Sequence, residues 1–425
     1  MKVLHTADIH LGANTYGRID PETGLNTRLL DFKRSFEFMV ARGLEEDIDL
    51  FLFCGDAYRT ADPTPTQQRT FAECLKPIAD AGIPIVMITG NHDHPVSFGK
   101  ASAIDIFGYV SGDVHVFRTP TKAVVETKSG PLQLLAMPWP IRSMLLSKGE
   151  HRKKNPAQVR EIIERLYVEY IEDAVGTFDP ALPTVLAGHF SVQGSEIAGS
   201  ERTSLIAHEP KFTPGQLARP PIDYVALGHI HKFQNRNHPE APGAMRMARA
   251  EAVPVVYSSS IERINFKEAA EQKGFVLVEI TAEDGAKQTA YSFVETPARR
   301  FVALSVDARD AAEPTEAILA EIDRHVVADA IVRVRYHIDE AQVAQIDPSR
   351  IRGALKEAFA VAAIERTVDP AERQRRTVVT RDATLKEAME RYVAQHDHLA
   401  ALRDEMIEAA LALEAELDAK RRDEE

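Results

Sequence analysis

Five short apolar segments of the 425-residue chain are each followed by aspartate, asparagine or histidine residues. The segments are rich in Ile, Val, Leu and Phe, which is typical of buried strands. The polar residues at their ends are Asp8 and His10, Asp56, Asn91 and His92, His189, and His229 and His231. Ligands of an open α/β sheet bind beyond the carboxyl ends of its strands, so we expect these side chains to converge on one crevice.

The segments between these strands predict an α/β layered fold. Apolar residues recur every three or four positions in 26–44, which predicts an amphipathic helix, and a second helix is expected over 67–81. A third helix has clear end signals, with Asn155 as its N-cap, Pro156 at its first position and Gly176 after its last turn. Strands that alternate with helices are typical of an α/β sheet.

Composition places the chain among ordinary globular proteins. Hydrophobic residues make up 44% and charged residues 27%, and no apolar run approaches the length of a membrane span. The only cysteines are Cys54 and Cys74, so we expect no disulfide framework and a cytoplasmic location. The net charge of -13 argues against a broadly basic surface. It does not exclude nucleic acid, because divalent metal and local Lys or Arg can meet phosphate on an acidic protein.

The chain divides into four expected parts. Residues 1–297 contain all five strand ends, and 298–370 form a small α+β domain without such residues at its strand ends, which favours an accessory or substrate-positioning role. Residues 371–383 are a charged linker, and 384–425 are a helical segment in which Thr384 and Glu387 fit a capping box. The apolar stripe of this helical segment predicts burial, either on its own domain or, as the preceding linker favours, on a partner protein.

The donor set predicts a site for two divalent ions. Two Asp, one Asn and four His are enough for two ions that share one carboxylate. The set contains no thiolate, which disfavours a structural zinc site, whereas mixed oxygen and nitrogen ligation suits manganese or iron, with zinc also possible. Two ions roughly 3.5–4 Å apart stabilise the attacking and leaving oxygens of an in-line phosphoryl displacement. The set therefore predicts phosphoester hydrolysis.

The order of these motifs resembles the calcineurin-like metallophosphoesterases, whose pattern is D-x-H, G-D, G-N-H-D/E, G-H and G-H-x-H. All five blocks occur in order between Asp8 and His231. The segment Ala7–Gly12, the Asp62–Pro65 loop and Leu227–Lys232 are similar to the SbcD-type DNA repair exonucleases. The resemblance implies a four-layer α/β/β/α core, a small α+β capping domain and a C-terminal helical tail. It also implies a manganese-dependent DNA exonuclease and endonuclease that acts in DNA end processing and double-strand-break repair.

The resemblance further implies roles for matching residues. Asp8, His10, Asp56 and His231 would hold one metal ion, and Asp56, Asn91, His189 and His229 would hold the other. His92 would contact the scissile phosphate and protonate the leaving 3′ oxygen. The implied partners are DNA, a second copy of the chain, and an SbcC-type coiled-coil ATPase bound through the C-terminal helices.

Contacts to DNA are harder to predict. Some members of the resembled family carry a second substrate-directed histidine where this chain has Arg59, which can bind phosphate but cannot exchange protons. Asp62 could instead pair with Arg59 and make it structural. The basic loop with Lys148, Arg152, Lys153 and Lys154 is another candidate for phosphate binding, with a solvated surface as the alternative.

A metallophosphatase or cyclic-nucleotide phosphodiesterase on the same metal core is the alternative function. The metal ligands alone cannot separate it from a nuclease. The additional domain and the apolar helical tail favour the nuclease, because a small-molecule hydrolase needs neither.

Overall fold

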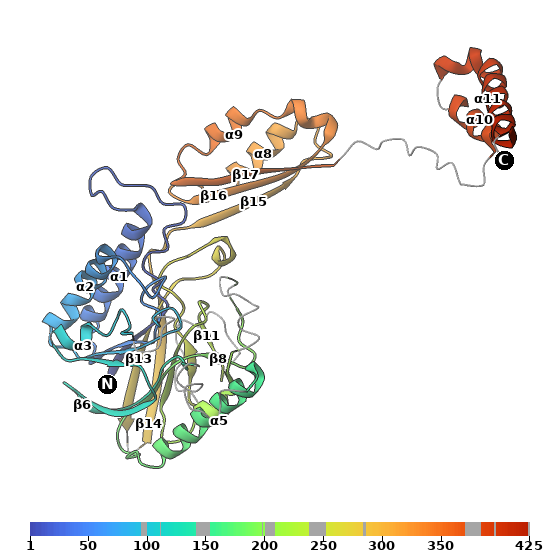
Figure 1. Cartoon of the computed structure of the whole chain (residues 1–425). Helices are drawn as coiled ribbons and strands as arrows, with labels where there is room; N and C mark the ends of the chain where they lie inside the picture. The colour runs from blue at the N-terminus through green and yellow to red at the C-terminus, as the bar shows by residue number, and fades with distance from the viewer. Residues whose placement is uncertain are drawn as a thin grey trace. The chain divides into compact units, whose positions relative to one another are not determined.

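A computed structural model describes residues 1–94, 100–110, 112–141, 154–197, 199, 209–237, 252–283, 286–369, 384–394 and 397–423 (Figure 1). The described chain falls into two compact units. The first comprises Met1–Val306, Thr315–Tyr336 and Asp347–Glu365, and the second comprises Asp307–Pro314, His337–Ile346 and the described part of 366–425. Among the described residues, no helix combines the length and apolar character that a membrane crossing requires.

The first six-stranded sheet has the strand order β14-β13-β1-β2-β3-β4. Its strands are β1 (Lys2–Thr6), β2 (Leu50–Phe53), β3 (Ile85–Ile88), β4 (Val114–Phe117), β13 (Gly274–Glu283) and β14 (Ala286–Glu295). Strands β1 to β4 are parallel, whereas β13 pairs antiparallel with both β1 and β14. The carboxyl ends of β1, β2 and β3 therefore lie together at one edge of the sheet.

The second six-stranded sheet has the order β11-β12-β10-β7-β6-β5. Its strands are β5 (Thr121–Thr127), β6 (Gly130–Met137), β7 (Thr184–His189), β10 (Tyr224–Gly228), β11 (Gln234–Asn235) and β12 (Val255–Tyr257). The central strands β6, β7, β10 and β12 are parallel. The ends of β7 and β10 carry the remaining histidines of the predicted site.

The alternation of side chains along the strands builds a four-layer α/β/β/α core. In β2, Leu50 and Leu52 join a cluster shared by the two sheets, whereas Phe51 and Phe53 pack with helices α1 (Thr27–Glu45) and α2 (Pro65–Asp80). In the second sheet, Leu135 of β6 packs with helix α5 (Pro156–Val175). Figure 1 shows α1 and α2 on one outer side and α5 on the other. The predicted fold class is confirmed.

Local sequence signals fix the ends of these helices. The side chain of Asn26 accepts a hydrogen bond from the backbone N–H of Arg28 at the start of α1. Asn155 and Gln158 form a capping box at the start of α5, and Gly176 follows its last residue, as the sequence predicted. Helix α2 begins with Pro65 after a capping box between Thr64 and Gln67.

A three-stranded sheet with the order β15-β16-β17 follows the core. It contains β15 (Phe301–Asp307), β16 (Ile331–Asp339) and β17 (Ala360–Asp369), together with α8 (Pro314–Asp323), η3 (Glu340–Gln345) and α9 (Pro348–Ala354). Figure 1 shows α8 and α9 over one face of this sheet, and Ile318, Ile322 and Ile351 of these helices are buried. Shorter elements in the core are α3 (Phe107–Val110), β8 (Ser191–Val192), β9 (Lys211–Phe212), α7 (Pro214–Leu217) and η2 (Phe266–Glu268).

The C-terminal part of the second unit contains α10 (Leu385–Ala394), η4 (Asp397–Leu402) and α11 (Arg403–Asp423). Helices α10 and α11 pack against each other around Val393 and Ile407, and Thr384 and Glu387 form the predicted capping box. Leu402 and Leu413 remain 46% and 61% exposed. The predicted linker, 371–383, lies outside the described residues.

Candidate metal centre

Tight turns at the strand ends aim the polar side chains at one point. Asp8, His10, Asp56 and His229 have φ angles of 54°, 49°, 62° and 92°. This left-handed conformation is unfavourable for residues with a side chain and persists only where the surroundings enforce it. Here the backbone N–H groups of Asp8 and His10 donate to the carbonyls of Gly55 and Asp56, which ties the ends of β1 and β2 together.

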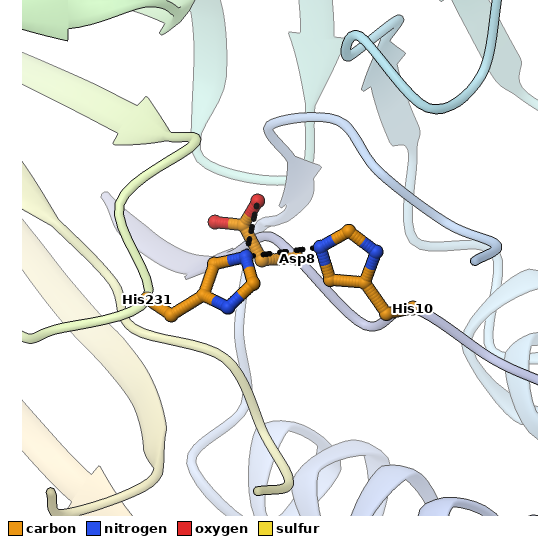
Figure 2. Close-up of side chains that lie close together, drawn as sticks. All are labelled: Asp8, His10 and His231. Carbon is orange, nitrogen blue, oxygen red and sulfur yellow. Dashed lines mark hydrogen bonds and ion pairs between the residues drawn. The ribbon is translucent and has the colours of Figure 1, made fainter. Parts of the chain in front are cut away.

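The first cluster consists of Asp8, His10 and His231 (Figure 2). The Nε2 atoms of His10 and His231 lie 3.0 Å apart, and Nε2 of His231 lies 3.8 Å from Oδ1 of Asp8. All three side chains are buried. Asp8 also accepts the backbone N–H of His229 at 2.9 Å, which links the end of β1 in the first sheet to the end of β10 in the second.

The second cluster consists of Asp56, Asn91, His189 and His229. Oδ1 of Asn91 lies 3.1 Å from Nε2 of His189 and 3.0 Å from Nδ1 of His229. Oδ2 of Asp56 lies 3.6 Å from Nε2 of His189 and also 3.6 Å from Nε2 of His10. Asp56 therefore stands between the two clusters. All seven residues that the sequence predicted as metal ligands are brought together.

Oxygen acceptors behind three of the histidines fix which ring nitrogen faces the cluster. Nδ1 of His189 contacts the carbonyl oxygen of Cys54 at 2.6 Å. Nε2 of His229 contacts Glu209 at 2.9 Å, and Nδ1 of His231 contacts Glu268 at 3.0 Å. A carbonyl or carboxylate oxygen only accepts, so each of these nitrogens carries a hydrogen, and in the neutral ring the other nitrogen offers its lone pair to the cluster.

The sequence reasoning missed Glu209 and Glu268. Neither glutamate follows a strand end. Each is also far in the sequence from the histidine that it contacts, by 20 residues for Glu209 and 37 for Glu268. Their role depends on tertiary proximity alone. The same holds for Trp139, the one tryptophan of the chain, whose half-buried ring lies 5.1 Å from the ring of His229 and 6.2 Å from that of His189.

His92 lies at the rim of the clusters. Its backbone N–H donates to Oδ1 of Asp56 at 2.8 Å, and its Nδ1 contacts the carbonyl oxygen of Arg59 at 3.0 Å. Its ring stands edge-on to His10 at 4.8 Å, and it is less buried than the predicted ligand histidines. A His92 nitrogen also lies within 4.8 Å of donor atoms of His10 and Asp56, so distance alone does not exclude metal contact.

Asp93 and His94 hold the loop rather than face the clusters. The buried carboxylate of Asp93 accepts the backbone N–H groups of Asp56, Ala57 and Gly90 at 2.7, 3.0 and 2.8 Å. Nε2 of His94 contacts Oγ1 of Thr89 at 2.9 Å. Asp93 therefore joins the loops after β2 and β3, which carry Asp56 and Asn91.

Glycine is required where these loops cross. A Cβ atom on Gly90 would lie 2.1 Å from Oδ1 of Asp56 and 2.6 Å from its backbone nitrogen. A Cβ atom on Gly55 would lie 2.4 Å from Nδ1 of His189, and Gly55 also has a φ of +93°. These positions explain why glycine precedes Asp56 and Asn91 in the sequence.

Burial and the close charges shift the pKa values in the site. Burial raises the pKa of Asp8 to about 6 and lowers the pKa of His10 well below its usual value. Burial alone would raise the pKa of Asp56, but the nearby His189 and His92 hold it well below its usual value. Burial opposes protonation of His189, yet the Asp56 carboxylate raises its pKa to about 9. Asp56 is therefore the group that attracts positive charge to the centre of the site.

The donor set fits divalent cations. Three histidines aim lone pairs inward because their other nitrogens are engaged, and the two Nε2 atoms of His10 and His231 face each other at 3.0 Å. Two ring nitrogens at this distance need a proton or a cation between them. Carboxylate and amide oxygens complete a mixed oxygen and nitrogen set without thiolate. The residues present therefore fit metal ions.

The predicted DNA-contact residues are only partly described. Arg59 and Lys154 are exposed, and no ion pair joins Arg59 to Asp62 in this part of the structure. Lys148, Arg152 and Lys153 lie outside the described residues. Among the described side chains, no contact joins Lys154 to a residue of either cluster.

Comparison with known proteins gives one family match and several relatives. The model of the calcineurin-like phosphoesterase family matches residues 1–233. The chain is 28% identical over 305 residues to the D subunit of the SbcCD nuclease from Bacillus subtilis (strain 168), and the alignment covers 68% of each chain. It is 24% identical over 239 residues to the corresponding SbcCD nuclease protein of Escherichia coli (strain K12), which covers 55% of this chain and 57% of that relative.

Two solved structures are also similar. A Thermus thermophilus protein, TT1561, is 12% identical with a TM-score of 0.31, over 68% of this chain and 97% of that one. A dimetal phosphatase from Danio rerio is 7% identical with a TM-score of 0.34, over 65% of this chain and 92% of that one.

Proposed function

The chain belongs to the calcineurin-like phosphoesterase family, and from this membership we propose that it is a metal-dependent DNA nuclease of the SbcD type. The observation that carries the proposal is the convergence of seven carboxylate, amide and imidazole donors at the ends of five strands from two sheets. The similarity to two SbcCD nuclease subunits supports DNA as the substrate. The proposed activity is hydrolysis of phosphodiester bonds, by exonuclease and endonuclease cleavage, in DNA end processing and repair.

The proposed site holds two divalent ions, with manganese as the proposed metal. Asp8, His10, Asp56 and His231 would bind one ion, and Asp56, Asn91, His189 and His229 would bind the other. The position of Asp56 supports this division, because one of its oxygens lies 3.6 Å from a nitrogen of each cluster. When bound, the ions would supply the Lewis acidity that stabilises the charge developing on a phosphodiester.

His92 is the proposed proton donor to the leaving 3′ oxygen. Its Nδ1 is engaged by the carbonyl oxygen of Arg59, so Nε2 is the nitrogen that would face the substrate. The bond from its backbone N–H to Asp56 fixes the ring next to the proposed ion sites. Burial lowers the pKa of the His92 ring below its usual value, so the proposed role requires the negative charge of a bound phosphate to favour the protonated ring.

DNA contacts and domain boundaries are also proposals. Arg59, Lys148, Arg152, Lys153 and Lys154 are the proposed phosphate contacts. Residues 1–297 would form the nuclease domain, 298–370 the capping domain that positions DNA, 371–383 the linker and 384–425 the partner-binding segment. The cytoplasm is the proposed location.

Two protein partners are proposed. Exposed Leu402, Leu411 and Leu413 on the C-terminal helices support binding to an SbcC-type coiled-coil ATPase. A groove of about 430 Å³ between α2 and α3 supports a homodimer. It is lined by Leu75, Ile85, Phe107 and Ile106, and Ile106 is 54% exposed.

A cleavage assay tests the function. The full-length chain with manganese is incubated with end-labelled linear DNA and, separately, with bis(p-nitrophenyl) phosphate. We expect degradation of the DNA, and we expect His92→Asn to abolish it while the metal content stays normal. Turnover of the small ester without any DNA degradation would instead favour a metallophosphatase or cyclic-nucleotide phosphodiesterase.

A further inference from the structure

The one-turn helix η2 contacts two parts of the first unit at once. Glu268 at its end binds the ring of His231, which belongs to the first cluster. Phe266 at its start packs against the three-stranded sheet. A single turn of helix therefore separates a contact to the proposed metal site from a contact to the proposed DNA-positioning sheet.

The Glu268 end of η2 is rigid. Glu268 is fully buried, and its second oxygen accepts the backbone N–H of Ile264 and pairs with Nζ of Lys273, both at 3.0 Å. Lys273 is also fully buried and donates to the carbonyl oxygen of His231 at 2.9 Å. Ser259 donates to the same carbonyl oxygen at 2.8 Å. Both the ring and the backbone of His231 are thus held by this group.

The Phe266 end of η2 is held by rings and by a cation. Phe266 packs edge-on against Phe301 of β15 at 5.1 Å and against Tyr16 at 5.5 Å. The guanidinium of Arg333 on β16 lies 4.4 Å from the centre of the Phe266 ring, which is close enough for a cation–π interaction. Ile331 of the same strand completes the apolar cluster.

We propose that Glu268 is a positioning residue for the metal ligand His231, and that η2 links this contact to the three-stranded sheet. The packing of Arg333 and Phe301 on Phe266 then sets the position of Glu268 and, through it, the orientation of the His231 ring. A carboxylate behind a ligating histidine fixes the ring and raises its basicity, so the affinity for the first ion depends on both ends of η2. This inference rests on the proposed metal binding.

Manganese titration of the metal-free full-length chain tests the Glu268 end. Isothermal calorimetry measures the affinity and number of ions, and urea unfolding without metal measures stability. We expect Glu268→Gln, which keeps a hydrogen-bond acceptor but loses the charge, to weaken one of two ion sites by about tenfold. The matched control is Glu262→Gln, because Glu262 is equally buried and binds Arg28 and the backbone N–H of Arg299 but no cluster residue. It should lower stability and leave both affinities unchanged.

Loss of the Glu268 charge leaves buried Lys273 unpaired, so a second variant separates folding from positioning. Glu268→Gln combined with Lys273→Met removes both charges, and we expect the same loss at one site with less loss of stability. Affinities equal to those of the unaltered chain in both variants would overturn the proposal.

The sheet end is tested by Arg333→Ala with Arg335→Ala as its control. Both arginines lie on β16, but Arg335 is exposed and pairs with Glu365 instead of packing on Phe266. We expect Arg333→Ala to lower the manganese affinity of one ion site by about two- to fivefold. Arg335→Ala should leave the manganese affinity of both sites unchanged. Equal affinities for these two variants would refute the link through η2. Failure of the unaltered chain to bind manganese would refute the proposed function itself.

Discussion

Asp93→Asn should disturb the metal site although Asp93 contacts no proposed ion. The carboxylate accepts three backbone N–H groups, from Asp56, Ala57 and Gly90, at 2.7, 3.0 and 2.8 Å. Oδ2 accepts two of them and Oδ1 accepts the third, from Ala57. An asparagine keeps one acceptor oxygen and replaces the other with an amide group that only donates. One buried N–H, most simply that of Ala57, then loses its partner.

The magnitude follows from that single lost bond. A buried donor left without a partner costs about 1–3 kcal/mol, and the neighbouring amide donors add repulsion, so we expect a loss of about 2–3 kcal/mol in the free energy of unfolding. Because Asp93 joins the loops that carry Asp56 and Asn91, we also expect manganese affinity to fall about tenfold. Burial and the adjacent Asp56 raise the pKa of Asp93 to about 7, so the comparison is made at pH 8, where the carboxylate is ionised.

Urea unfolding without metal and manganese calorimetry at pH 8 measure the two effects. Asp105→Asn is the matched control, because Asp105 accepts the backbone N–H of Ser102 and pairs with Arg118 without touching a cluster residue. It should lose stability but keep its manganese affinity. An Asp93→Asn variant with the stability and affinity of the unaltered chain would refute the reasoning, since no buried N–H could then depend on the second oxygen.

Two further changes test the packing and the buried histidine of the core. Gly90→Ala forces a methyl group to 2.1 Å from Oδ1 of Asp56. We therefore expect the free energy of unfolding, measured in urea, to fall by about 1–3 kcal/mol, and manganese binding to weaken. Gly215→Ala, which meets no atom within 4 Å, should change neither. Burial lowers the pKa of His5 from 6.5 to about 3. Between these pH values His5 binds a proton in the unfolded chain but not in the folded chain, so the free energy of unfolding falls as the pH drops from 6.5 toward 3. His5→Gln keeps a partner for Tyr224 but cannot titrate, and the difference in unfolding free energy between it and the unaltered chain should change by about 1.4 kcal/mol per pH unit between pH 6 and 4. A difference that is constant with pH would contradict a neutral buried His5.

The sequence predicted the elements that carry the site because their signals are local. Helix α1 (Thr27–Glu45) lies within one residue of the predicted range 26–44 at each end, and α5 begins after the predicted cap Asn155. The end of a buried strand can also be recognised from the local sequence. Five such ends, each followed by Asp, Asn or His, were enough to predict which side chains converge. Two sheets rather than one supply these ends, which the family resemblance implied and strand periodicity did not.

The parts that were missed depend on tertiary contacts. Strand β14 alternates between buried Tyr291 or Phe293 and more exposed neighbours, but it was not predicted, and β17 has a weak alanine-rich pattern. The predicted helical segment 384–425 contains, in its described part, helices α10 and α11 with the 3-10 helix η4 directly before α11. Glu209 and Glu268 reach their histidines only through the folded chain, so no spacing could have indicated them.

The predicted domain boundary after Pro297 adjoins a contact that the sequence does not reveal. Arg299, two residues after Pro297, is buried and pairs with Asp31 of α1 through both carboxylate oxygens. The guanidinium of Arg299 also lies 3.7 Å from the centre of the Phe359 ring. An arginine pair of this kind forms between residues far apart in the sequence, so composition could not reveal it.

The most direct test of the central claim is the number and coupling of bound manganese ions. Metal-free full-length chain is saturated with manganese, the ions per chain are counted by mass spectrometry, and electron paramagnetic resonance measures their magnetic coupling. If Asp56 is shared by two ions, we expect two ions per chain with a coupled signal, and Asp56→Asn should abolish the coupling. One ion per chain, or two ions without magnetic coupling, would contradict a two-metal site bridged by Asp56.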